Sequence, residues 1–565
     1  MIGSIVLVGV ILVIGAGIVI GIRASAGAGQ TGTGTTAQPT ARRVVVFILL
    51  FALVVIAAIG MSGLLGRLLD SGNVIASNDV SGLARSLAFT LIAGPFAAVL
   101  WWVQWRRIGG DERASVAWGL YVAAMSTVAL ITFSVSLLTA AAALVRGDGQ
   151  PRLVATGVVW AAVWVWHRWM SGHTHQGPTR LATVAPILGA VFGLLLGLGG
   201  GVTSLGALID AAVNIVAATA SLGEPWWHSP LQALIWGLGG LAVWWWFWIH
   251  DDARSLRGGL ADVALVAVGI VLAAIVTVAG AATTLFVLLR LAFDRTEPIA
   301  LTLEPLGVAV AAAGFGALVW TYHRGQSRLH SPATRRARIL VTSGVGLITA
   351  ASGLGVIVNA LLASLTAVFV GSDARTLLLG GISALIVGGP VWWVSWKPTA
   401  AVDPSEAANT GRRLYLILVF GVSAVVAIIT LLVIGYRLFE FALGDTTGAS
   451  VVDRMRAPLG LLVATGLVAG YHFAVWRRDR SNTPPTPERR IGRVILVTGA
   501  DPEPLTQAIT DATGAPVTVW RRSAPTNPEG PTIDELTTAL SGVRAGRVLV
   551  VTGPHGGLEV IPLQD

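Results

Sequence analysis

Two short stretches of the chain hold histidines and carboxylates that could support chemistry. His167, His173 and His175 lie close together in sequence, and neutral imidazole is a common ligand of transition metals. No Cys or carboxylate accompanies them, so they do not by themselves predict a metal site. The stretch His250-Asp251-Asp252 would add carboxylates only if the fold brought the two loops together. The sequence therefore assigns no catalytic residue and no metal ligand.

A second group of candidates lies near the C-terminus. Two similar apolar runs end in Thr498-Gly499 and Thr552-Gly553, with Asp501 and His555 nearby. If the runs are neighbouring parallel strands, these turns share the edge where α/β folds usually place ligands. Neither turn is a Walker A loop or a GxGxxG turn, and a lone Asp or His at such a place is typically a helix cap or a loop residue. We therefore assign no cofactor.

Ionisable groups inside apolar runs would indicate a transporter, because burying a charge in lipid is costly and is tolerated mainly for function. The candidates lie near the ends of their runs, where they can reach water: Asp210, Asp262, Arg290, Arg437 and Glu440. Asn359 is the amide well inside a run, and we interpret it as a helix-packing contact rather than a substrate ligand. Ion-coupled transport loses support accordingly.

Glycines recur every four residues at Gly189, Gly193 and Gly197. This spacing predicts a face on which another helix packs closely. The alternative is an unwound segment that lines a cavity. Pro95, Pro186 and Pro390 are expected to kink their helices.

The composition of the chain indicates which kind of secondary structure holds these residues in place. The chain has 565 residues, of which 54% are hydrophobic and 12% charged, and its mean hydropathy is +0.75. These values predict an integral membrane protein. The chain has no Cys, which excludes disulfides and thiolate sites. Its net charge of +9 comes from arginines that flank apolar runs, so we interpret them as topological anchors rather than a nucleic-acid surface.

Between Arg42 and Arg480 the apolar runs form six pairs, each with a long member followed by a shorter one. With an apolar run at Ile2–Ile22, which we interpret as an uncleaved anchor, the sequence predicts about thirteen transmembrane helices. The long members are residues 43–66, 114–145, 181–209, 258–291, 339–370 and 414–443. The short members are residues 86–105, 153–170, 231–249, 305–322, 376–396 and 457–476.

Each short member ends in aromatic residues followed by Arg, Lys or His, as in Trp102-x-x-Trp105-Arg106 and Trp320-x-Tyr322-His323-Arg324. Tryptophan favours the lipid headgroup boundary, so this pattern predicts an aromatic belt that fixes helix depth; a box for a ligand or lipid headgroup is the alternative. The loops after the short members are richer in Arg and Lys than those within pairs. The positive-inside rule then predicts a multi-pass cell membrane protein with its N-terminus outside and its C-terminal domain in the cytoplasm.

Two consecutive pairs together resemble one copy of an uncharacterised bacterial four-span membrane domain of unknown function that occurs in tandem. The motifs that carry the resemblance are Arg412-Arg413-Leu414-Tyr415 and the Trp-rich endings. It implies about three copies, residues 42–170, 180–324 and 335–480, which we call segments 1, 2 and 3. The resemblance implies no activity.

The remaining divisions are an anchor at 1–23, a flexible linker at 24–41, a Pro-rich linker at 481–490 and an α/β domain at 491–565. In the last, strands are predicted at 493–498, 517–521, 547–552 and 558–563, and helices at 503–513 and 533–543. About 75 residues form a marginal core, so we expect this domain to pack on a second copy of itself or on the membrane domain.

Three hypotheses for function remain. The first is a non-enzymatic membrane anchor, scaffold or sensor whose cytoplasmic domain contacts a protein or small ligand. The second is a transporter or channel, and the third is a membrane enzyme acting on lipid-linked substrates. The absence of recognisable site chemistry favours the first.

Overall fold

The computed structural model describes residues 37–70, 80–216, 225–294, 296–366, 373–400, 410–444, 450–482, 491–499, 501–522, 531–541, 543, 545–553 and 557–563. The chain divides into two compact units, residues 1–401 with 414–472 and residues 402–413 with 473–565. The predicted anchor at 1–23, most of the linker at 24–41 and residues 483–490 of the Pro-rich linker lie outside the described residues.

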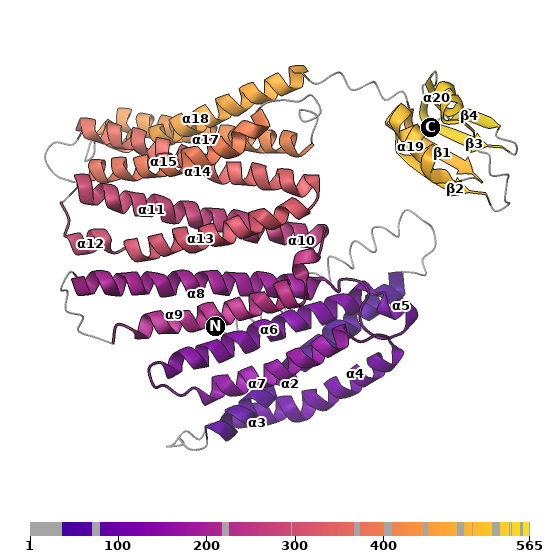
Figure 1. The fold of residues 1–565 in the computed structure, drawn as a ribbon, viewed down its shortest axis with the longest axis horizontal. Coiled ribbons are helices and arrows are strands. Elements are labelled where there is room, and N and C mark those ends of the chain that lie inside the picture. Colours follow the sequence, from indigo (N-terminus) through magenta and orange to yellow (C-terminus); the bar gives the residue numbers. More distant parts are fainter. Residues whose placement is uncertain are drawn as a thin grey trace. The chain divides into compact units, whose positions relative to one another are not determined.

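The first unit is built from long helices, and Figure 1 shows consecutive ones side by side, such as α8 with α9 and α14 with α15. Segment 1 contains α2 (Ala37–Leu69), α3 (Val80–Ala88), the π-helical turn η2 (Phe89–Ala93), α4 (Gly94–Arg107), α5 (Gly110–Arg113), α6 (Val116–Leu144) and α7 (Pro151–Ser171). Segment 2 contains α8 (Val184–Val216), α9 (His228–Trp245), η3 (Trp246–His250), η4 (Ala253–Ser255), α10 (Gly259–Ala264), η5 (Leu265–Leu272), α11 (Ala273–Phe293), α12 (Ile299–Leu303) and α13 (Leu306–Gln326). After η6 (Ser327–Leu329), segment 3 contains α14 (Pro332–Thr366), α15 (Asp373–Ala400), α17 (Thr410–Ala442) and α18 (Val451–Asn482).

Eleven helices in the described part are long and apolar enough to cross a membrane. The chain is therefore an integral membrane protein with many apolar helices, as its composition predicts. Helix α7 has 21 residues but is not among the eleven. The predicted total of thirteen also includes a helix at 2–22, outside the described residues, and so it stays a prediction.

The prolines act through their position in the helix. Pro95 is the second residue of α4, which follows directly on the π-helical turn η2, and in the first turn of a helix the missing N–H of a proline is tolerated. The kink predicted at Pro186 is wrong, because α8 begins at Val184 and a proline in the first turn leaves no intrahelical bond unmade.

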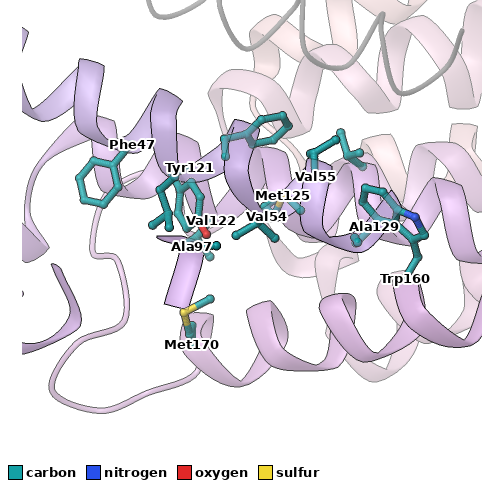
Figure 2. Packing of buried hydrophobic residues seen from close by; sticks show 14 of the residues in the cluster. Phe47, Val54, Val55, Ala97, Tyr121, Val122, Met125, Ala129, Trp160 and Met170 are labelled. Carbon is teal, nitrogen blue, oxygen red and sulfur yellow. The ribbon is translucent and has the colours of Figure 1, made fainter. Parts of the chain in front are cut away.

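The largest buried cluster lies in segment 1, between α2, α6 and α7 (Figure 2). Trp118, Tyr121 and Trp160 are almost fully buried in it, and the ring of Phe47 contacts two of them with centroids 5.4 and 5.7 Å away. This packing fixes the position of Tyr121 opposite α7, which matters for the site described below.

The C-terminal unit contains a four-stranded sheet of order β2-β1-β3-β4. Strands β1 and β2 and strands β1 and β3 are parallel, whereas β3 and β4 are antiparallel. Helices α19 and α20 contact each other and bury Leu505, Ile509, Leu536 and Leu540 against the sheet. The elements are β1 (Ile491–Thr498), α19 (Pro502–Thr513), β2 (Val517–Arg521), α20 (Ile533–Ser541), β3 (Ala545–Thr552) and β4 (Leu558–Leu563). The predicted small α/β sheet is thereby confirmed.

Candidate functional site

A buried histidine recurs near the end of the last helix of each segment. In all three, ring Nδ1 lies 2.8 Å from the backbone carbonyl oxygen four residues earlier. The pairs are His167 with Val163, His323 with Val319, and His472 with Val468. Because a carbonyl only accepts, Nδ1 carries the proton of the neutral ring and Nε2 is left as an acceptor. Each segment thus contains one buried histidine whose ring is held by its own helix in the same way and whose Nε2 is an acceptor.

The sequence analysis missed this repeat, although the chain carries a signal for it. Val-Trp-x-aromatic-His-Arg occurs at 163–168 and at 319–324, and Val-Ala-Gly-Tyr-His occurs at 468–472. The third ending differs from the other two, because its aromatic residues Phe473 and Trp476 follow the histidine. His167 and His323 are 156 positions apart, and His323 and His472 are 149 positions apart, as expected of an internal repeat.

A pair of tryptophans on the second helix of each segment accompanies the histidine. The pairs are Trp101 with Trp105, Trp244 with Trp248, and Trp392 with Trp396. The first of each pair contacts the aromatic residue before the histidine, with ring centroids 5.0 Å apart for Trp101 and Trp166 and 5.7 Å apart for Trp244 and Tyr322 and for Trp392 and Tyr471. The Trp-rich endings therefore pack on one another.

Hydrogen bonds join these aromatic groups in segments 2 and 3. Trp248 Nε1 donates to the Tyr322 hydroxyl over 2.9 Å, and Trp396 Nε1 donates to the Tyr471 hydroxyl over 2.7 Å. In segment 1 the tyrosine is replaced by Trp166, and Trp101 Nε1 contacts Sδ of Met170 at 3.1 Å instead. These indoles are satisfied within the protein.

The third helix of each segment contributes a different group beside the histidine. In segment 1 the Tyr121 hydroxyl donates to His167 Nε2 over 3.0 Å. In segment 3 the Tyr415 ring lies 6.1 Å from His472, its hydroxyl is 3.4 Å from Ser343 Oγ, and His472 Nε2 has no partner in the described part of the chain. In segment 2 the residue beside the histidine is Gly269, whose backbone packs on the His323 ring.

A cavity of about 30 Å³ lies at this place in segment 2. Its lining includes Trp244, Trp248, Gly269, His323 and His330, with apolar residues of α8 completing the wall. Trp244 Nε1 is buried and has no hydrogen-bond partner among the described residues. The cavity thus combines an apolar wall with a few polar groups and has room for a water-sized molecule.

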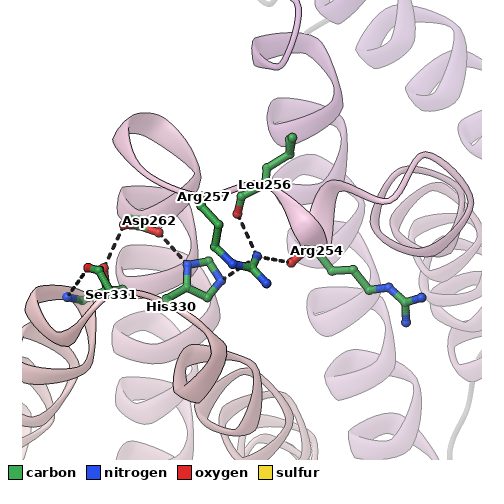
Figure 3. Close-up of polar contacts among 7 residues, drawn as sticks. Arg254, Leu256, Arg257, Asp262, His330 and Ser331 are labelled. Carbon is green, nitrogen blue, oxygen red and sulfur yellow. Dashed lines mark hydrogen bonds and ion pairs between the residues drawn. The ribbon is translucent and has the colours of Figure 1, made fainter.

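A polar network lies beside the cavity, where the loop after η3 meets the loop before α14 (Figure 3). His330 Nδ1 lies 2.6 Å from Asp262 Oδ1, and Arg257 Nη1 lies 3.4 Å from His330 Nε2. Thr334 donates to the other Asp262 oxygen over 2.8 Å. Since Arg257 can only donate, His330 donates from Nδ1 and accepts at Nε2. This network holds two loops that are about 70 residues apart in sequence.

The first candidate stretch is only partly brought together. His167 is buried and bonded to Tyr121, whereas His173 packs edge-on against Trp105 and Trp169 with centroids 5.3 and 5.4 Å away. His175 lies beside His173, with ring centroids 6.2 Å apart. Within the described residues, no group of three or more His, Asp or Glu side chains is arranged to hold a metal ion.

The fold does bring the two candidate loops together. Arg168 Nη2 lies 2.6 Å from Asp251 Oδ1, and this carboxylate is 5% exposed. His250 Nδ1 is 3.3 Å from the same oxygen. Hydrogen bonds from Ser255 and Arg254 hold the pKa of the exposed Asp252 below its ordinary value. The charges are used in structural pairs that join segment 1 to segment 2.

The prediction that Arg290 reaches water is wrong. Its side chain is buried, with ion pairs of 2.8 Å to Glu297 and 3.8 Å to the fully buried Asp294. Thr296 and Thr376 donate to Asp294 over 2.7 and 2.9 Å, and these bonds, that from Thr296 first, hold the pKa of this carboxyl below its ordinary value. A buried charge here is compensated by an opposite charge, as burial requires.

The other ionisable candidates also have partners inside the protein. Asp210 lies against Gly307 of α13, and Asp262 belongs to the network of Figure 3. Arg437 donates to the carbonyl of Arg454, and the Tyr436 hydroxyl lies 3.4 Å from Glu440.

The glycine face of α8 is confirmed as a packing face. A Cβ on Gly193 would lie 2.3 Å from the Trp244 backbone, and one on Gly200 would lie 2.2 Å from the Gly237 backbone. Asn359 behaves differently from the prediction, because its Oδ1 has no partner among the described residues. It lines an apolar groove of about 710 Å³ between α14, α17 and α18.

In the C-terminal unit, the two strand ends are neighbours as predicted. Thr552 Oγ1 donates to Thr498 Oγ1 over 3.0 Å, and both side chains are buried. Asp501 caps α19 by accepting from Glu503 N over 3.3 Å. His555 lies outside the described residues.

One face of this sheet is left uncovered by α19 and α20. On the covered face Val494, Leu496, Val548 and Val550 are fully buried. Their neighbours in sequence point to the other face, where the register aligns half-buried Ile495 with Leu549 and Val497 with Val551. Trp520, paired with Val497, is 59% exposed there.

Comparison with known proteins identifies a domain without an assigned activity. Residues 43–166 and 336–467 each match the family model of a domain of unknown function, DUF5671. The matches fall in segments 1 and 3, so the resemblance to an uncharacterised, repeated membrane domain is confirmed. No curated protein and no solved structure matches the chain.

Proposed function

We propose that this protein is a non-enzymatic scaffold or sensor of the cell membrane whose C-terminal α/β domain binds a protein partner in the cytoplasm. The helical unit would have thirteen spans in six two-helix repeats, with segment 2 as a third, diverged copy of the domain matched in segments 1 and 3. The recurrence of a buried histidine and a tryptophan pair in segment 2 supports that third copy.

The uncovered face of the C-terminal sheet is the observation that carries the proposal. Sheets of water-soluble domains normally bury an apolar face, and an exposed apolar patch marks an interaction site. Here half-buried Ile495, Val497, Leu549 and Val551 form an apolar face that α19 and α20 leave uncovered, and exposed Trp520 adds a residue type enriched at binding hot spots. A protein surface with a complementary apolar patch would complete this domain.

The charges of the helical unit support a structural role for the bundle. Several ionisable side chains of its described helices form ion pairs, such as Arg168 with Asp251 and Arg290 with Asp294 and Glu297. Charges committed to such pairs serve helix packing and leave less for carrying an ion.

Site-specific photo-cross-linking in membranes tests the interaction. A photo-reactive residue in place of Trp520 should give an adduct with one defined protein, whereas the same residue in place of Thr537, exposed on α20, should not. Leu549→Gln should weaken the adduct, since it removes an apolar contact from the centre of the face. Equal adducts from both positions, or none from Trp520, would reject the proposal.

The proposed topology can be tested separately, because the chain has no Cys. Single cysteines replacing exposed Ser481 and Asp148 should be labelled from opposite sides by a membrane-impermeant thiol reagent. Labelling of Asp148→Cys from outside intact cells supports a cytoplasmic C-terminal domain. Labelling of Ser481→Cys from outside would reverse the orientation.

Transport of an apolar solute is the second candidate, favoured by the groove of about 710 Å³ between α14, α17 and α18. Asn359 would supply the polar contact, because its Oδ1 has no partner among the described residues. Reconstituted protein that moves a fluorescent apolar solute across vesicles, and loses this activity in Asn359→Leu, would favour transport over the scaffold.

A further inference from the structure

The position occupied by Gly269 distinguishes segment 2 from segments 1 and 3. Tyr121 and Tyr415 place a phenol ring beside their histidines, with centroids 5.5 and 6.1 Å away. A Cβ on Gly269 would lie only 2.7 Å from Cδ2 of His323, so no larger residue fits on this backbone. Gly269 lies in the π-helical stretch η5, and π-helical turns occur frequently at functional sites.

Because segment 2 has Gly269 where the other segments have a tyrosine, two polar atoms beside the cavity have no hydrogen-bond partner among the described residues. The His323 ring is 2% exposed and makes its one hydrogen bond within the described residues through Nδ1, so Nε2 is a free acceptor. Trp244 Nε1 is a buried donor without a described partner. Both residues line the cavity, and their ring centroids are 6.3 Å apart. A buried polar atom without a hydrogen-bond partner is unfavourable, so a molecule that bonds to both groups would be favoured here.

A hydroxyl group between the two rings would satisfy both atoms. It would accept from Trp244 Nε1 and donate to His323 Nε2. The cavity of about 30 Å³ has room for it, since a water molecule needs about 10–15 Å³. We propose that segment 2 binds a small hydroxyl-bearing molecule, water or a small alcohol, in the role that the Tyr121 hydroxyl has in segment 1.

The polar network of Figure 3 borders this site. His330 lines the cavity and is held by Asp262 and Arg257, while Ala253 and Leu256 of the same loop region form part of the wall. These contacts hold the wall of the cavity on the side of the two loops.

An experimental structure in lipid, at a resolution that shows ordered water, tests the proposal. A density peak within hydrogen-bond distance of both His323 Nε2 and Trp244 Nε1 is the expected result. An empty cavity in a map that shows waters elsewhere, or a cavity filled by a lipid chain, would overturn the proposal.

Matched variants assign the peak to these two groups. Trp244→Phe keeps an aromatic ring but removes the donor, and the peak should be lost or displaced. Trp392→Phe makes the same change in segment 3 and should leave the peak in place. A peak that stays unchanged in Trp244→Phe would overturn the role of Trp244.

Soaking the protein with ethanol separates the two sources of the hydroxyl. An elongated peak that keeps both hydrogen bonds identifies a site for small alcohols, and an unchanged peak identifies a site for water. Both outcomes require the hydroxyl contact with His323, and a peak that contacts neither polar atom contradicts it.

Discussion

The hydroxyl of Tyr121 lies 3.0 Å from Nε2 of His167, so the buried histidine of segment 1 has both ring nitrogens satisfied inside the protein. The equivalent histidines of segments 2 and 3 are held by the same backbone bond but lack this hydroxyl contact. One repeated scaffold therefore carries three different environments around one imidazole. This difference makes the proposed site in segment 2 specific to that segment.

Replacing Tyr121 by Phe tests the value of that bond. The variant leaves a buried acceptor without its donor, and we expect a loss of about 1 kcal/mol of unfolding free energy, in the range of polar contacts within membranes. Thermal unfolding in detergent measures the loss. Tyr436→Phe is the matched control, because Tyr436 is 67% exposed. Equal losses in both variants would show that the buried bond contributes nothing.

The sequence predicted the helix pairs because apolar length and flanking arginines depend on local composition alone. It predicted the glycine face of α8, on which another helix packs closely, for the same reason, because the spacing of Gly189, Gly193 and Gly197 is a local pattern. The strands of the C-terminal domain followed from short apolar runs bounded by Gly and Pro.

The contacts of the candidate site could not be predicted in this way. The bond between Asp262 and His330 joins residues 68 positions apart, and it depends on which loops meet after the helices pack. The juxtaposition of Gly269 and His323 depends on the π-helical turn of η5, which nothing in the apolar pattern indicates. The histidine repeat itself could have been found by aligning the three helix endings.

A second prediction concerns the packing of α8 on α9. Gly200→Ala should destabilise the protein by about 1–3 kcal/mol, because its Cβ would lie 2.2 Å from the backbone of Gly237 and force the helices apart. Gly199→Ala should be neutral or slightly stabilising, since nothing lies within 4 Å of its Cβ and alanine favours helix. The unfolding temperatures of the two variants in one detergent provide the comparison. Similar temperatures would argue against close packing at Gly200.

A third prediction concerns the ion pair between segments 1 and 2. Arg168→Met leaves the buried Asp251 carboxylate without its cation, and we expect a larger loss of stability than in Arg254→Met, whose partner Asp252 is exposed. Exposed pairs contribute about 0–1 kcal/mol, whereas an uncompensated buried charge costs more. A double-mutant cycle with Asp251→Asn measures the coupling directly. A coupling energy near zero would show that the 2.6 Å contact does not hold the segments together.

The last prediction is a dependence on pH that originates at Asp294. Its folded-state pKa is lowered from the ordinary value of 3.8, chiefly by the hydrogen bonds from Thr296 and Thr376. A lowered pKa contributes stability that is present above the unfolded-state value and is lost as the pH falls through the folded-state value. The unfolding temperature should therefore stay level down to about pH 4 and then fall. Asp294→Asn should be less stable at neutral pH and should lose part of the acid dependence, whereas Asp148→Asn, in an exposed loop, should keep both. An unchanged acid profile in Asp294→Asn would place the titrating group elsewhere.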